Sequence, residues 1–169
     1  MAEIPAADHD SIVQPATILQ FFRDLFPSDT PGWLTIFTAD RHTAWYPTKS
    51  LKAAANYALR QADTQNVWFG LGLRREQLKD GRGVEDDIIS LPGFVADIDL
   101  KHPVHKAENL PETVEEARKI LECIPLHLSY LIHTGYGIQP FLLFREPWIL
   151  TNQAERDAAE QLWRRLIAT

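Results

Sequence analysis

Asp97 and Asp99 are the residues whose type and spacing point most clearly to chemistry. They follow the apolar segment Phe94–Ala96 and stand two residues apart. In a strand, side chains at this spacing lie on the same face, so the two carboxylates repel each other and resist desolvation. A divalent cation removes both costs, and Mg²⁺ or Mn²⁺ on carboxylates keeps positions open for phosphate. The pair predicts a metal site for phosphoryl or nucleotidyl transfer; an ordinary loop or cap is the alternative.

A glycine-rich turn is the second candidate site. The segment His133-Thr134-Gly135-Tyr136-Gly137-Ile138-Gln139 joins two expected strands. Gly135 and Gly137 permit positive φ and close approach of a ligand, and successive N–H groups in such a turn can bind phosphate. Gln139 can donate to a phosphate oxygen or a base. The alternative is a plain hairpin in which the glycines serve the turn geometry.

Basic residues bracket the aspartates. The set before them is Arg74, Arg75, Lys79 and Arg82, and the set after them is Lys101, His102, His105 and Lys106. Each set is either a nucleic-acid contact or a solvated loop. The net charge of −6 excludes a wholly basic binding surface, but it leaves room for local basic strips.

Other side chains are assigned structural roles. We expect Cys123 and the strand tryptophans Trp33, Trp45, Trp68 and Trp148 in the core, and His133 as a structural histidine. Tyr136, between two glycines, is expected to be exposed. A single cysteine permits no internal disulfide and fits a reducing cytoplasm. No apolar run reaches the about 18 residues of a membrane span, and no signal peptide is recognisable, so no membrane association is expected.

The elements that position these residues follow from hydrophobic periodicity and turn residues. We expect helices over 15–26, 48–62, 112–123 and 151–167, and strands over 33–38, 43–46, 66–73, 91–99, 129–133 and 138–144. Residues 74–90 read as a loop with a short helix near 84–89. The length of 169 residues suits one domain, expected over 14–169 after a flexible leader at 1–13. The mixed order favours an α+β fold with one principal sheet.

Taken together, the motifs resemble the primase–polymerase branch of the archaeo-eukaryotic primase superfamily, in its phage, plasmid and mobile-element form. That family has a Gly/Arg loop, a Leu-Pro-Gly segment, an Asp-hydrophobic-Asp metal motif, and a Ser/Thr-Gly-x-Gly-x-His turn leading into an aromatic strand. The corresponding segments are Gly81-Arg82-Gly83, Leu91-Pro92-Gly93, Asp97-Ile98-Asp99 and Thr134-Gly135-Tyr136-Gly137-Ile138-Gln139. Their order agrees from about residue 66 to residue 150.

The resemblance implies an RRM-like catalytic fold with a central mixed or antiparallel sheet flanked by helices. It implies a DNA primase or polymerase performing template-dependent nucleotidyl transfer in replication. Asp97 and Asp99 would hold one or two Mg²⁺ or Mn²⁺ ions on the nucleoside triphosphate. The resemblance implies that the nucleotide is contacted by Thr134, Gly135, Tyr136, Gly137, Gln139 and Arg82. It implies weaker contacts with nucleic acid by Arg74, Arg75 and Lys101. The implied partners are single-stranded or primer–template DNA and a helicase or other replication module.

Two departures from the family pattern leave alternatives open. Gln139 stands where the family usually has histidine, so it can hydrogen-bond phosphate but supplies no positive charge. The family's third metal-binding aspartate has no counterpart after Trp148, which suggests a fragment of a longer protein, or else a degenerate or self-contained variant. The competing functions are a non-catalytic module that binds nucleotide or single-stranded nucleic acid, and a metal-dependent nuclease or phosphohydrolase.

Overall fold

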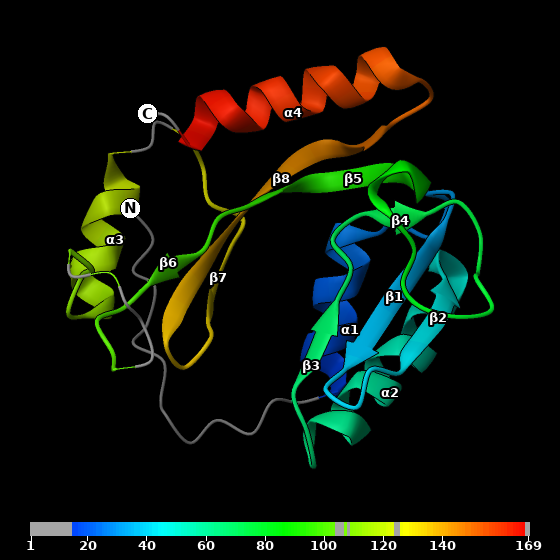
Figure 1. Cartoon of the computed structure of the whole chain (residues 1–169), viewed down its shortest axis with the longest axis horizontal. Coiled ribbons are helices and arrows are strands. Elements are labelled where there is room, and N and C mark those ends of the chain that lie inside the picture. Colours follow the sequence, from blue (N-terminus) through cyan, green and yellow to red (C-terminus); the bar gives the residue numbers. More distant parts are fainter. Residues whose placement is uncertain (1–14, 104–106, 108, 124–125, 168–169) are drawn as a thin grey trace.

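One antiparallel sheet organises the protein. The computed structural model describes residues 15–103, 107, 109–123 and 126–167; the expected leader, His105 and Lys106 lie outside the described residues. Within these ranges, eight strands and four α-helices form an α+β fold, and every strand pair is antiparallel (Figure 1). The expected α+β class with a helix-flanked antiparallel sheet is therefore confirmed.

The sheet has the strand order β2-β1-β4-β5-β8-β6, with β3 also on β1 and β7 also on β8. Its strands are β1 Trp33–Thr38, β2 Thr43–Pro47, β3 Val67–Phe69, β4 Leu73–Arg74, β5 Ile88–Val95, β6 Ile98–Asp99, β7 Tyr130–His133 and β8 Gly137–Ile149. The helices are α1 Pro15–Leu25, α2 Leu51–Ala62, α3 Val114–Glu122 and α4 Gln153–Ile167, with 3₁₀ turns η1 Thr48–Ser50 and η2 Glu85–Asp87.

The main core lies between the helices α1 and α2 and one face of the sheet. Apolar residues at helical spacing, including Phe22 and Leu25, bury the inner side of α1. They pack with Leu34 and Ile36 of β1 and with Phe141 of β8. Because Phe141 belongs to this cluster, the core joins the first strands of the chain to β8.

The other two helices cover separate parts of the sheet (Figure 1). Thr113 caps α3 by accepting from the Glu116 N–H at 3.2 Å, and α3 buries Leu121 against Ile138 of β8. Asn152 caps α4 in the same way, accepting from the Glu155 N–H at 3.1 Å. Both caps lie where the sequence indicates helix starts.

Two expected strands are shorter than the sequence suggests. The strand expected over 66–73 is split into β3 and β4 by Gly70-Leu71-Gly72. The strand expected over 91–99 begins earlier, at Ile88, and breaks at Ala96-Asp97 before β6. The β5–β8 register also shifts between Leu91 and Gly93, which accommodates a proline that cannot donate to the ladder.

Two core assignments are wrong. Cys123 is exposed, because it follows the last turn of α3 on the solvent side. Trp68 is 49% exposed, because alternation in β3 turns Val67 and Phe69 toward the core cluster and Trp68 away from it. The other three strand tryptophans, Trp33, Trp45 and Trp148, are part-buried, and none of them belongs to either core cluster.

Gly93 explains the Leu-Pro-Gly segment in structural terms. A Cβ built there would lie 2.2 Å from the Leu142 carbonyl oxygen and 2.7 Å from the Leu143 Cα, both backbone atoms of β8. We therefore expect Gly93→Ala to reduce the free energy of unfolding by about 3 kcal/mol, measured by urea denaturation. The control is Gly81→Ala, where φ is +73° and nothing lies within 4 Å, so only about 1 kcal/mol of backbone strain is expected. Equal losses would contradict this account.

Tyr130 ties β7 to α1 by donating its hydroxyl to the Asp24 carboxylate. Burial, together with this carboxylate, raises the pKa of Tyr130 to about 12. The folded state then keeps a proton that the unfolded chain loses near pH 10. The contribution of the Tyr130 hydroxyl to the free energy of unfolding is therefore complete below pH 10 and disappears as pH rises toward 12. In thermal melts, Tyr130→Phe should lose less stability between pH 9 and pH 11.5 than the wild type. Parallel losses in both proteins would refute the assignment.

Candidate metal and nucleotide site

The pairing of β6 with β8 brings the two sequence motifs together. Asp99 lies opposite Gly137, and Ile98 lies opposite Ile138. Val95 pairs with Phe141 in the same register, and the Ala96 N–H donates to the Pro140 carbonyl at 3.2 Å. Continuing this register places Asp97 opposite Gln139. Both predicted metal ligands therefore border the turn that carries the predicted nucleotide contacts.

The pair belongs to the face of the sheet opposite α3. Ile98 and Leu100 pack against the α3 cluster, so the alternating residues Asp97 and Asp99 are directed to the other face. Asp97 is exposed and Asp99 is part-buried. Gln139, opposite Ile132 of β7, is also part-buried. The arrangement combines two carboxylates and an amide at one accessible edge.

The glycines of the turn have different roles. Gly135 adopts φ +94°, as the sequence suggests. Gly137 does not have a positive φ; a Cβ there would lie 2.6 Å from the Ile98 carbonyl oxygen and 3.3 Å from the Asp99 Cα. Gly137 therefore does not use the positive φ that glycine permits, and the group that approaches it closely is the backbone of β6. Gly137 holds the Asp99 backbone against the turn.

Two backbone donors of the turn are engaged within it. The Thr134 N–H donates to the Gly137 carbonyl at 2.9 Å, and the Gly135 N–H donates to His133 Nδ1 at 3.3 Å. These two N–H groups therefore serve the geometry of the turn itself. His133 supports the turn, as expected for a structural histidine, although its side chain is exposed.

Tyr136 is 53% exposed, as expected. Its ring centroid lies 4.5 Å from that of His102, and its carbonyl accepts from the Leu100 N–H at 2.8 Å. These contacts tie the tip of the turn to the segment that follows β6. Tyr136 thus presents an exposed aromatic ring beside the segment that follows β6.

The predicted basic contacts are divided between two places. Lys101 directly follows β6, and its ammonium forms an ion pair with Glu112 at 2.6 Å. The hydrogen bond from Lys101 lowers the pKa of Glu112, and the same contact raises the pKa of Lys101. Arg74 and Arg82 line a different pocket, whose residues include none from the Asp97–Asp99 or Thr134–Gln139 segments. Arg75 is exposed after β4.

The pocket lined by Arg74 and Arg82 also contains two aromatic residues, Phe37 and Trp68, for which the sequence predicted no ligand. Phe37 of β1 lies opposite Trp68 of β3 and beside the Arg82 loop. The signal was present in the alternation of Val67-Trp68-Phe69, which places the middle aromatic residue on the outer face.

The two carboxylates fit a hard divalent cation. Mg²⁺ is held in many nucleotide sites by one or two carboxylates together with substrate phosphates and water. Among the described residues, no cluster of three or more His, Cys, Asp or Glu side chains is arranged to hold a metal. Asp97 and Asp99 therefore offer two carboxylates on one face of the sheet and no further protein carboxylate is grouped with them among the described residues.

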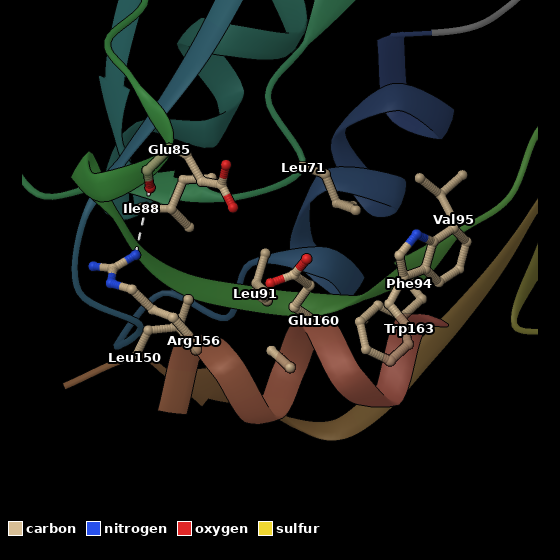
Figure 2. Close-up of a pocket in the computed structure, with 12 residues that line it drawn as sticks. Leu71, Glu85, Ile88, Leu91, Phe94, Val95, Leu150, Arg156, Glu160 and Trp163 are labelled. Carbon is tan, nitrogen blue, oxygen red and sulfur yellow. Dashed lines mark hydrogen bonds between the residues drawn. The ribbon is translucent and has the colours of Figure 1, made fainter. Parts of the chain in front are cut away.

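A second cavity, of about 360 Å³, lies between α4 and β5 (Figure 2). Its lining is mainly apolar, and the Trp163 ring centroid lies 5.3 Å from that of Phe94. Arg156 closes one end by donating to the carbonyls of Glu85 at 3.4 Å and Asp86 at 3.0 Å. No predicted site residue lines this cavity, so it plays no part in the candidate site.

Comparisons with known proteins give no family assignment: no family model, curated protein or solved structure matches the chain. In the described part of the chain, no helix is both long and apolar enough to cross a membrane.

The role of Gly137 can be tested by substitution. Gly137→Ala should push β6 away from β8, so the Leu100 amide, which donates to the Tyr136 carbonyl at 2.8 Å, should exchange at least about tenfold faster. Hydrogen exchange measured by NMR gives this rate directly. Thr134→Ala, an exposed change in the same turn, is the control and should leave the Leu100 amide protected. Unchanged protection in Gly137→Ala would contradict the assigned role.

Proposed function

We propose that this chain carries the metal and nucleotide site of a template-dependent nucleotidyl transferase, a DNA primase or polymerase acting in DNA replication. The observation that supports the proposal is the pairing of β6 with β8, which sets Asp97 and Asp99 beside Gln139 and the Thr134–Gly137 turn. Two motifs distant in sequence thus share one edge, as the resemblance to the primase–polymerase family requires.

Asp97 and Asp99 would hold one or two Mg²⁺ or Mn²⁺ ions through their carboxylate oxygens. These ions supply positive charge for the triphosphate and for the pyrophosphate that leaves. The exposure of Asp97 leaves its carboxylate open to a ligand bound from solvent. Asp99, part-buried and backed by Gly137, contributes the more rigid of the two carboxylates.

Gln139 would orient the triphosphate without adding charge. Its amide N–H groups donate hydrogen bonds to phosphate oxygens, and its neutrality leaves charge compensation to the metal. Because the Thr134 and Gly135 N–H groups are engaged within the turn, the Thr134 hydroxyl would donate to the phosphate in their place. Tyr136 offers its exposed ring to the sugar or base.

The proposal predicts metal-dependent nucleotide binding that requires both aspartates. In calorimetric titrations with a deoxynucleoside triphosphate and Mn²⁺, Asp97→Ala and Asp99→Ala should each weaken binding by more than about 100-fold, since each removes a direct metal ligand. Asp157→Ala, an exposed aspartate on α4, is the matched control and should bind like the wild type. Unchanged binding in both site variants would rule the site out.

A second assay separates the proposed reaction from its competitors. Incubation with a labelled primer–template, Mn²⁺ and nucleotides gives an extended primer for a polymerase. Release of nucleoside monophosphates would instead identify a nuclease. Nucleotide binding that persists without divalent metal, and without turnover, would identify a non-catalytic binding module.

A further inference from the structure

A cluster of aromatic and basic side chains lies away from the metal edge. It consists of Phe37 of β1, Trp68 of β3, Arg74 of β4 and Arg82 of the following loop, here named the Trp68 platform. Phe37 alternates with Ile36, which faces the core, so Phe37 and its partner Trp68 lie on the outer face of this part of the sheet. All four residues line one pocket of about 290 Å³.

The geometry of the Trp68 platform is that of a stacking surface. The Phe37 and Trp68 ring centroids are 5.8 Å apart at an interplanar angle of 40°. The Arg82 guanidinium carbon lies 5.1 Å above the centroid of the Phe37 ring. Trp68 nevertheless remains 49% exposed. A large aromatic ring held beside another ring and half open to solvent can receive a stacked planar ligand.

Arg74 supplies a second cation at the floor of the pocket. Its Nη1 donates to the Val84 carbonyl, while its Nε is buried and has no hydrogen-bond partner among the described residues. Two acidic residues partly offset the positive charge of the arginines. Glu85 lines the pocket, and Asp87 interacts electrostatically with Arg74. Asp87 also accepts a hydrogen bond from the Val84 N–H at 2.8 Å. The site is therefore only weakly cationic, and stacking rather than charge would dominate recognition.

We propose that the Trp68 platform binds single-stranded DNA, with one base stacked on Trp68 and the adjoining phosphates contacted by Arg82 and Arg74. Aromatic rings flanked by arginine bind single strands with little sequence preference, because every base presents a flat π face. The pocket lies at the small end of ligand cavities, which suits one base rather than a whole cofactor. The inference rests on the proposed function only in that the bound strand would be the template or the product.

Fluorescence anisotropy of a fluorescein-labelled oligo-dT, without divalent metal, tests this inference on the full chain. Trp68→Ala should weaken binding by about tenfold or more, whereas Trp68→Phe should retain most of it. Arg82 is exposed in a loop, so Arg82→Gln should not disturb folding. It should weaken binding, and the slope of the logarithm of the binding constant against the logarithm of salt concentration should fall by about the value of one phosphate contact. Leu162→Ala and Arg60→Ala, exposed changes elsewhere, are the matched controls and should bind like the wild type.

The outcomes are decisive in both directions. Loss in Trp68→Ala and Arg82→Gln, with binding retained in Asp97→Ala, would establish a strand site independent of the metal edge. Absence of oligo-dT binding by the wild type, or unchanged binding in Arg82→Gln and Trp68→Ala, would overturn the inference. The oligo-dT assay contains no metal or triphosphate. Its result therefore stays interpretable even if the chain is found to have no nucleotidyl transferase activity.

Discussion

The long strand β8 is the constraint on which the rest of the structure depends. It runs for 13 residues and pairs along one edge with β6 and then β5, and along the other with β7. Through Phe141 it also enters the core made by α1 and β1. A shift of one residue would exchange its two faces, placing Phe141 on the wrong side of the sheet. Burial of Phe141 in one cluster and of Ile138 in the other therefore fixes the register that sets Asp97 opposite Gln139.

Two glycines allow the backbones to meet along that edge. Gly93 permits contact between β5 and β8, and Gly137 permits contact between β6 and the turn. Their substitution by any larger residue would place a Cβ against backbone atoms, which cannot move as a side chain can. Gly93 and Gly137 thus serve the placement of β5 and β6, and with them Asp97 and Asp99, against β8 and its turn.

Helices and single residues were predictable from sequence to different degrees. The starts of α3 and α4 follow from Thr113 and Asn152, because capping is local. The break between β5 and β6 was not predictable, since it depends on pairing with a distant strand. Nor was the exposure of Trp68 recognised, because its apolar neighbours suggested a core strand. The association of Asp97 with Gln139 came only from the family resemblance; no local pattern encodes the register that brings them together.

The central claim is that a divalent metal binds at the edge shared by Asp97, Asp99 and the Thr134–Gln139 segment. Paramagnetic line broadening by Mn²⁺, with a deoxynucleoside triphosphate present, locates the metal directly in the NMR spectrum of the folded chain. The account predicts that the broadened amides centre on 96–100 and 134–139, and that Asp97→Ala/Asp99→Ala abolishes the effect. Broadening centred on another part of the chain, or retained in the double variant, would contradict it.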